Sequence, residues 1–295
     1  MPLFAPVRRA WPKTRASCRV PGFACKRRGA DMRIGFIGLG VQGLPLALNL
    51  LDGGHELHGF DVRPEPLDEL RDRGGTVAAS PAELGAACEV VMICVVSDQQ
   101  VRDVLAGEDG VLASARPGLI VVLHSSVSTD TIAEAAKATR DRGVVLVDAP
   151  VSGGAQGARA RTMSFMVGGE EAALDRCQPL FELSGPNILR TGPAGTATLA
   201  KLAHQVAIIG NIMAMAEAVR LGTAGGLSAE MVKQAVAGGL ARSWIAETWG
   251  EIKMAPHALP LYSKDLENSL RFAKQIGISL PGAELMKLEL PNIVP

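Results

Sequence analysis

Residues 34–61, IGFIGLGVQGLPLALNLLDGGHELHGFD, constrain the fold of this chain more than any other segment. An apolar run leads into three glycines, which open a stretch whose apolar residues have helical spacing. A second apolar run follows and closes on an acid, Asp61. Two apolar strands joined by a helix are the unit from which parallel sheets are built. The segment therefore predicts a strand–helix–strand unit at the start of an α/β fold.

The three glycines have the spacing of a dinucleotide-binding turn. The first permits the tight turn, the second lets the backbone approach a pyrophosphate, and the third lets the helix pack on the strand. An ordinary structural turn is the alternative for a glycine triplet alone, but here the strand, the helix and the acid are all in place. The turn residues that we expect to bind the cofactor are Gly38, Leu39, Gly40, Val41, Gln42 and Gly43.

Asp61 ends the second predicted strand, where a ribose-binding acid is expected. A carboxylate there accepts hydrogen bonds from ribose hydroxyls and repels a 2′-phosphate, which favours NAD over NADP. Arg63 points the other way, because a nearby arginine can hold that phosphate. We expect NAD as the cofactor and keep NADP as the alternative.

Composition narrows the classes of partner. Hydrophobic residues make up 47% and charged residues 20% of the chain, a globular balance, and the formal net charge is +0. We therefore expect neither a nucleic-acid partner nor a membrane partner, and no apolar run long enough to cross a bilayer. The 5 cysteines are scattered and never form a CxxC pair, which indicates a reducing, cytoplasmic setting and no metal site.

The first 31 residues differ from the rest, being rich in Arg and Lys with Asp31 as their single acid. A transit peptide would share this bias, but four prolines would interrupt its amphipathic helix. A secretory signal would need a continuous apolar core. We favour a third interpretation, in which translation starts at Met32, and expect residues 1–31 to lie outside the fold.

From Met32 onward, apolar runs alternate with helical stretches, which predicts an α/β, doubly wound (Rossmann) parallel sheet. The predicted strands are 33–37, 57–61, 90–96, 119–123, 144–148, 164–169 and 187–192. The predicted helices between them are 41–53, 65–73, 98–106 and 129–142.

The chain changes character after Gly192, where a helix-compatible, Ala- and Met-rich stretch of about thirty residues begins. Further helices are predicted at 228–237, 243–253 and 262–276. We expect a Rossmann domain over 32–194 and an all-helical domain over 195–295, built on the long helix.

Two later motifs carry polar groups suited to chemistry. DAPVSGGAQGA, residues 148–158, follows a strand, and its Ser152-Gly153-Gly154 turn offers a hydroxyl and bare amides that can cradle a carboxylate. A plain glycine loop is the alternative. AKLAHQ places Lys201, His204 and Gln205 on one helix face. A lysine among apolar residues titrates more easily and suits general acid–base work, although a surface lysine and a hydrogen-bonded histidine are the simpler interpretations.

Together these motifs resemble the β-hydroxyacid dehydrogenase family, which includes 3-hydroxyisobutyrate dehydrogenase, tartronate semialdehyde reductase and, more distantly, 6-phosphogluconate dehydrogenase. The resemblance runs from about residue 33 to residue 281. It rests on four signatures in the family's order: GFIGLGVQG with NLLDGGH, HSSVST, DAPVSGG, and GPAGTATLAKLAHQ with a later KDL.

The resemblance implies a role for each matching residue. Lys201 matches the catalytic lysine, which accepts the hydroxyl proton in oxidation and donates it in reduction. Gln205 stands where an Asn usually orients the substrate, and Lys264 matches a lysine that closes over cofactor and substrate. The remaining implied residues are Ser125, Ser152, Gly153, Gly154 and His204 for the substrate, and Asp61, Val95, Val96 and Ser125 for the cofactor.

The chain departs from the family at several points. His204 and Gln205 replace two Asn residues, and Arg161-Thr162-Met163 replaces the usual Gly-Thr-Leu, which adds a charge either near the pocket or on the surface. The family usually has further helices after the position of LPNIVP.

The predicted function is hydride transfer between nicotinamide and a small 3-hydroxy acid, such as 3-hydroxyisobutyrate, or its semialdehyde, with Lys201 as general acid–base. We expect a homo-oligomer, dimer or tetramer. A non-catalytic dinucleotide-binding module of the same fold and a reductase of another carbonyl or imine are the alternatives.

Overall fold

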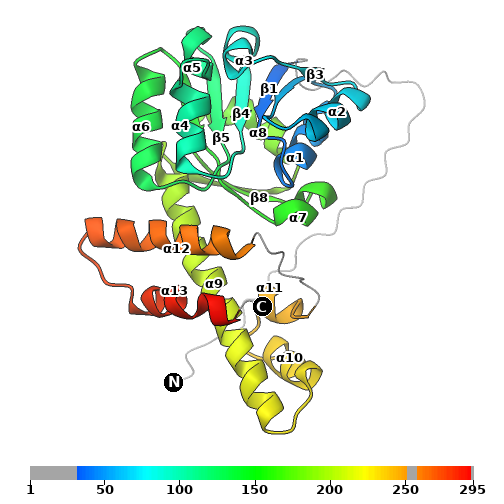
Figure 1. Cartoon of the computed structure of the whole chain (residues 1–295), viewed down its shortest axis with the longest axis vertical. Helices are drawn as coiled ribbons and strands as arrows, with labels where there is room; N and C mark the ends of the chain where they lie inside the picture. Colours follow the sequence, from blue (N-terminus) through cyan, green and yellow to red (C-terminus); the bar gives the residue numbers. More distant parts are fainter. Residues whose placement is uncertain (1–31, 251–257, 294–295) are drawn as a thin grey trace, which may run out of the picture. The chain divides into compact units, whose positions relative to one another are not determined.

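The structure is a computed structural model that describes residues 32–250 and 258–293 (Figure 1). These residues belong to one compact unit, Asp31–Pro295. The predictions about residues 1–31 lie outside the described part of the chain.

The first half of the described chain alternates strands and helices, as predicted. The strands are β1 (Arg33–Ile37), β2 (Glu56–Phe60), β3 (Thr76–Val77), β4 (Val90–Ile93), β5 (Ile120–Leu123), β6 (Val145–Asp148), β7 (Val151–Ser152), β8 (Ser164–Gly168) and β9 (Asn187–Gly192). The helices are α1 (Gly43–Asp52), α2 (Pro64–Asp72), α3 (Pro81–Ala87), α4 (Asp98–Ala106), α5 (Val111–Ser114), α6 (Thr129–Arg140), α7 (Gly154–Ala160) and α8 (Glu171–Glu182).

The strands form a single sheet in the order β3-β2-β1-β4-β5-β6-β8-β7, with β9 beside β8. Strands β1 to β6 are parallel, which confirms the doubly wound fold. At one edge the sheet departs from the parallel arrangement, because β8 runs antiparallel to β6 and β7. Only the short α7 joins β7 to β8, and a parallel return needs a crossover of a dozen residues or more.

Both faces of the sheet are covered, so its central strands are apolar throughout. On β4, Val90 and Met92 pack into one hydrophobic cluster with α1 and α8, whereas Val91 and Ile93 pack into a second cluster with α4 and α6. All four are buried. Continuous burial explains why these strands show no alternation of polar and apolar residues.

The second half is helical and is built around α9 (Thr196–Ala224). Helices α10 (Ala229–Ala237), α11 (Trp244–Glu247), α12 (Ala258–Gln275) and α13 (Pro281–Ile293) all contact α9. The helix predicted over 243–253 is a single turn, α11, which ends at Glu247. Gly250, three residues later, takes a left-handed φ of 87°, and residues 251–253 lie outside the described residues.

The long helix also corrects one expectation. By length and composition α9 could cross a bilayer, since its most apolar window has a mean hydropathy of 1.4. In the structure it packs against the helices α6, α10, α11, α12 and α13 and against the strands β6, β8 and β9. Core helices of water-soluble proteins pass the same test, so the match is weak evidence for a membrane span.

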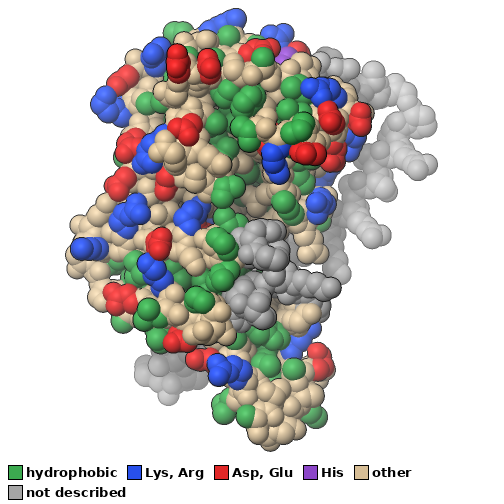
Figure 2. Space-filling view, viewed as in Figure 1, with side chains coloured by type: hydrophobic (Ala, Val, Ile, Leu, Met, Phe, Trp, Pro, Cys, Tyr) green, Lys and Arg blue, Asp and Glu red, His purple; other side chains and the backbone are tan. Residues whose placement is uncertain are grey.

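The surface fits the balanced composition. On the face shown in Figure 2, Lys and Arg side chains alternate with Asp and Glu side chains over the described residues, and neither sign forms a broad field.

Candidate active site

The glycine turn between β1 and α1 leaves no room for side chains at two of its glycines. Gly38 has a left-handed φ of 88°, and a Cβ there would lie 2.4 Å from the Cys94 carbonyl oxygen. A Cβ on Gly43 would lie 1.9 Å from the Gly38 carbonyl oxygen. At Gly40 the nearest atom would be Arg63 Nη2, 3.8 Å away, so the backbone is open where a pyrophosphate would approach.

Asp61, the acid that follows β2, accepts hydrogen bonds from neighbouring residues. Asp61 Oδ2 accepts a hydrogen bond from Leu39 N at 2.7 Å, and Oδ1 accepts bonds from Arg63 N at 2.9 Å and Arg63 Nε at 3.1 Å. Arg63 Nη2 also donates to Oδ2 at 3.3 Å. Burial opposes ionisation, but the hydrogen bonds from Arg63 and Leu39 outweigh it and hold the pKa of Asp61 below its ordinary value.

Lys201 lies in the first turns of α9 with only 7% of its surface exposed. Its Nζ donates a hydrogen bond to the Val151 carbonyl oxygen at 2.8 Å. Burial lowers the pKa of Lys201 to about 8, Asp265 partly opposes this, and Lys264 adds to it. Both protonation states of the amine are therefore accessible near neutral pH, as a general acid–base requires.

A chain of hydrogen bonds runs beside this lysine. Gln205 Nε2 donates to Asp265 Oδ2 at 2.5 Å, and Gln205 Oε1 lies 3.1 Å from His204 Nδ1. His204 Nε2 lies 3.3 Å from Ser152 Oγ. The structure thus joins the Ser152-Gly153-Gly154 turn to α9 and α12.

Ser152 ends β7, and the two glycines that follow have conformations rare for other residues. Gly153 has a φ of 132° and Gly154 a φ of 59°. A Cβ on Gly153 would come within 2.8 Å of Met163 Sδ. The turn keeps its backbone amides accessible, because Gly153 and Gly154 are both exposed.

The other predicted residues lie at the carboxyl ends of β4 and β5. Ser125 is buried and its Oγ accepts a hydrogen bond from Val95 N at 2.9 Å. Lys264, on α12, donates to the Val96 carbonyl oxygen at 3.1 Å and to the Ser126 carbonyl oxygen at 2.6 Å. These contacts hold α12 against the two loops that follow β4 and β5.

Three groups were missed as site residues. Asp265 accepts a hydrogen bond from the side chain of Gln205, and the carbonyl oxygen of Val151 accepts one from the Lys201 amine. Asp148 accepts one from the backbone at the start of α9. Asp148 is fully buried and its Oδ2 accepts a hydrogen bond from Thr198 N at 2.8 Å. Its place at a strand end, like the place of Asp265 beside Lys264, was the available signal.

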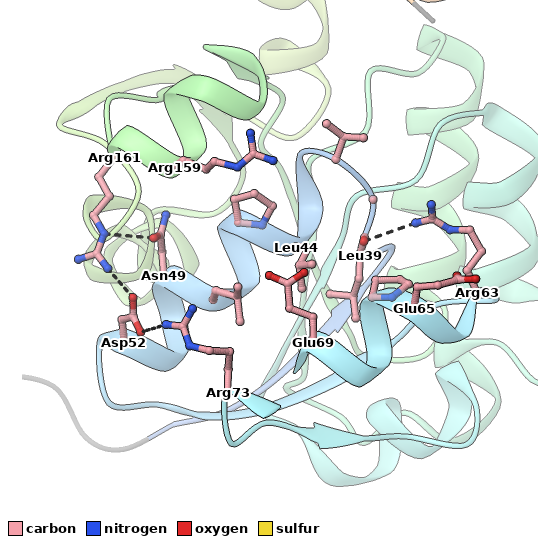
Figure 3. A pocket seen from close by; sticks show the side chains of 15 residues that line it. Leu39, Leu44, Asn49, Asp52, Arg63, Glu65, Glu69, Arg73, Arg159 and Arg161 are labelled. Atoms are coloured by element: carbon pink, nitrogen blue, oxygen red, sulfur yellow. Dashed lines mark hydrogen bonds and ion pairs between the residues drawn. The ribbon is translucent and has the colours of Figure 1, made fainter. Parts of the chain in front are cut away.

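The charge added by Arg161 lies beside α1. Arg161 ends α7 with a left-handed φ of 57°, donates to Asn49 Oδ1 at 3.1 Å, and forms an ion pair with Asp52 at 2.8 Å (Figure 3). It lines a pocket of about 510 Å³ that shares Leu39 with the glycine turn. Within residues 32–250 and 258–293, no cluster of His, Cys, Asp and Glu could hold a metal.

Comparison with known proteins agrees with this geometry. The family model of the NAD binding domain of 6-phosphogluconate dehydrogenase matches residues 33–192, and that of the NAD-binding domain of NADP-dependent 3-hydroxyisobutyrate dehydrogenase matches residues 195–289.

Two curated relatives match most of the chain. The 2-hydroxy-3-oxopropionate reductase of Escherichia coli is 38% identical over 255 residues, which are 85% of this chain and 87% of that protein. The NAD-dependent L-serine dehydrogenase of Pseudomonas aeruginosa is 34% identical and covers 88% of each chain.

Solved structures show the same fold. The 3-hydroxyisobutyrate dehydrogenase of Mycobacterium tuberculosis, solved with L-serine, superposes with a TM-score of 0.78 at 30% identity, covering 88% of this chain and 92% of its own. Psf3, solved with NADP⁺ and 2-OPP, gives a TM-score of 0.80 at 26% identity, covering 88% of this chain and 93% of its own.

Proposed function

Because the chain belongs to the β-hydroxyacid dehydrogenase family and is an NAD(P)-dependent oxidoreductase of small hydroxy acids, we propose that Lys201 is its general acid–base. The burial of this amine beside the substrate turn carries the proposal, since burial brings its pKa to about 8. A neutral amine accepts the hydroxyl proton when the substrate is oxidised. The charged amine returns a proton when the carbonyl form is reduced.

The remaining groups position the reactants. The open backbone at Gly40 and the α1 N-terminus fit a pyrophosphate, so this turn would hold the cofactor together with Asp61. When bound, the nicotinamide supplies or accepts the hydride at the carbinol carbon. Ser152 and the amides of Gly153 and Gly154 would anchor the substrate carboxylate, so that the hydroxyl lies near Lys201.

Replacing Lys201 tests the proposal directly. Lys201→Met keeps the length of the apolar stem and removes the amine, so turnover should fall by about 10²- to 10⁴-fold. Binding of NADH, followed by fluorescence titration, should stay close to that of the unchanged protein. Near-normal turnover in this variant would refute the assignment. If the unchanged protein turned over none of a panel of hydroxy acids, with NAD or with NADP, the result would favour a non-catalytic module.

The choice of cofactor belongs to the same proposal. Asp61 supports NAD, and its ion pair with Arg63 lessens the repulsion of a 2′-phosphate, so we propose NAD as the preferred cofactor with NADP accepted more weakly.

The remaining predictions concern the whole chain. We propose domains over 32–194 and 195–295, a homo-oligomeric state and a cytoplasmic setting. Light scattering coupled to size-exclusion chromatography measures the oligomeric state, and cell fractionation tests the compartment.

A further inference from the structure

Helix α7 continues directly from the turn proposed to bind the substrate carboxylate. Its first residue is Gly154, and Gly153 caps it. The amide of Gly157, within the helix, donates a hydrogen bond to the Gly153 carbonyl oxygen at 2.9 Å. The conformation of the Ser152-Gly153-Gly154 turn therefore depends on where α7 lies.

Apolar packing does little to fix this helix. The buried residues of α7 are Gly157 and Ala158, and both are small. Stabilisation by burial is roughly proportional to the apolar area removed from water, so two small residues contribute little of it. Helix α7 packs against α1, and polar side chains at that contact supply further ties.

Asn49, on α1, makes the first tie. It is only 6% exposed, and its Nδ2 donates to the Ala158 carbonyl oxygen at 2.9 Å and to Ser184 Oγ at 3.0 Å. Its Oδ1 accepts a hydrogen bond from Arg161 Nε at 3.1 Å. A carbonyl can only accept and a guanidinium can only donate, so the amide has one orientation. Asn49 thus connects α1 to the last turn of α7 and to the residue that ends it.

Arg161 makes the second tie. Among residues 32–250 and 258–293 it is the single non-glycine residue with a positive φ, 57°. A left-handed backbone costs free energy in a residue that has a Cβ, and glycine is the usual residue at such a helix end. Arg161 Nη2 donates to Asp52 Oδ2 at 2.8 Å, and Asp52 also pairs with Arg73 at 2.8 Å (Figure 3). Contacts of this kind are what hold a strained residue in place.

We propose that Asn49 and Arg161 are positioning residues for the carboxylate turn. Through α7 they hold the amides of Gly153 and Gly154 in the arrangement that binds the substrate carboxylate. Their side chains bond α7 and its surroundings instead of the reacting groups, so they set the affinity for the acid and not the proton transfer at Lys201. This inference rests on the proposed function, which assigns the carboxylate to this turn.

The first experiment removes the side-chain bonds of Arg161 and keeps its Cβ. In Arg161→Ala, KM for the hydroxy acid should rise by about three- to tenfold, the range for partly exposed charged bonds. The substrate is whichever of 3-hydroxyisobutyrate, glycerate and 3-hydroxypropionate the unchanged enzyme turns over fastest. The inhibition constant of propionate, which has the carboxylate without the hydroxyl, should rise by the same factor. The kcat and the dissociation constant of NADH should not change, because only binding of the acid is weakened.

Two further variants serve as controls. Arg161→Lys keeps a cation that can pair with Asp52 and should restore most of the lost affinity. Arg159→Ala removes the same charge from an exposed position of the same helix, and KM should stay within about twofold, as for most surface substitutions.

Arg161→Gly separates positioning from stability. Glycine suits the left-handed backbone, so the thermal midpoint of Arg161→Gly should exceed that of Arg161→Ala. Both variants lack the ties, so KM should be at least as high in Arg161→Gly. A purely structural role would make KM follow the midpoint. Asn49→Ala should also raise KM, and its effect should combine with Arg161→Ala less than multiplicatively, because the two residues share one hydrogen bond.

Four results would overturn the inference. They are an unchanged KM in Arg161→Ala, a KM that recovers in Arg161→Gly, an equal rise of KM in Arg159→Ala, and a dissociation constant for NADH that rises together with KM. The Arg161 and Arg159 variants alter exposed positions, so misfolding of Asn49→Ala does not protect the idea. Turnover that Lys201→Met abolishes would leave the proposed function standing when this inference fails. Absence of turnover with all three acids would count against both.

Discussion

In the proposed cofactor site, Asp61 and its neighbour Arg63 both affect the choice between NAD and NADP. An ionised carboxylate has about four acceptor positions, and Leu39 N and Arg63 supply four hydrogen bonds. Ribose hydroxyls must therefore displace the two bonds from the Arg63 side chain, whereas a 2′-phosphate would recruit that side chain. The side chain of Arg63 is 53% exposed.

Arg63→Ala should raise the preference for NAD over NADP by about tenfold, because it frees the carboxylate and removes a charge-assisted bond to the 2′-phosphate. Asp61→Asn should shift the preference towards NADP. Fluorescence titration of both reduced cofactors gives the ratio of dissociation constants. An unchanged ratio in both variants would show that the adenosine ribose does not meet this pair.

The Lys201 amine should impose opposite pH dependences on the two directions of reaction. Since its pKa is lowered to about 8, the neutral base is present above that pH and the acid below it. The rate of oxidation should rise with pH through about 8, and the rate of reduction should fall over the same interval. Because Asp265 raises the pKa of Lys201, Asp265→Asn should move both limbs to lower pH. If the pH profiles of oxidation and reduction did not shift in Asp265→Asn, Lys201 would not be the titrating group.

Among the elements, α9 is held at its start by a residue of the sheet. Asp148 ends β6, and its carboxylate accepts a hydrogen bond from the first turn of α9, one turn before Lys201. Helix N-termini favour such a negative group, which offsets part of the cost of burying it. Burial nevertheless raises the pKa of Asp148. The sheet and α9, the helix of Lys201, are thus joined through one carboxylate.

Asp148→Asn should lower the free energy of unfolding by about 1–3 kcal/mol, since the buried partner groups lose a charged acceptor. It should also lower kcat, because Lys201 lies one turn farther along α9. Ser228→Ala is the matched control: Ser228 caps α10 through Met231 N, away from the reacting groups. That variant should cost about 1 kcal/mol and leave kcat unchanged. Urea unfolding and steady-state kinetics separate the two effects, and equal kcat in both variants would contradict the role given to Asp148.

At the scale of the whole molecule, α12 ties the helical half to the first half of the chain at two places. Near its middle turns Lys264 bonds two loop carbonyls, and at its last residue Gln275 bonds Asp130 and Thr129 at the start of α6. The placement of Asp265 depends on the position of this helix. Contacts remote from the reacting atoms therefore affect the geometry of the site.

Gln275→Ala removes one of these ties without touching the groups around Lys201. We expect KM for the hydroxy acid to rise a few-fold, which is the range for loss of one or two exposed hydrogen bonds, with the pH limb near 8 preserved. Gln234→Ala, which removes a side-chain bond within α10, serves as control and should leave KM unchanged. A shifted pH limb in Gln275→Ala would mean that the tie acts on Lys201 itself.

The sequence predicted those parts of the molecule that depend on neighbours along the chain. Apolar runs and glycine spacing are local, so β1, α1 and the glycine turn were found with little error. The reversal at β8 was missed because two-residue β7 and the short α7 carry no periodic signal. The bond between Gln205 and Asp265 joins positions 60 residues apart, and no linear pattern specifies such a contact.

The hydrogen bond from Lys201 to the Val151 carbonyl oxygen bears on a distance within the proposed site, that between the Lys201 amine and Ser152. Val151 is followed directly by Ser152, so the residue whose carbonyl accepts the hydrogen bond from Lys201 is adjacent in β7 to the proposed carboxylate anchor. Adjacent Cα atoms are a fixed distance of about 3.8 Å apart. With the roles proposed for Lys201 and Ser152, the separation of the proton-transfer group and the carboxylate anchor is set by adjacent residues of one strand, and an acid whose hydroxyl lies one carbon nearer or farther would not reach both groups.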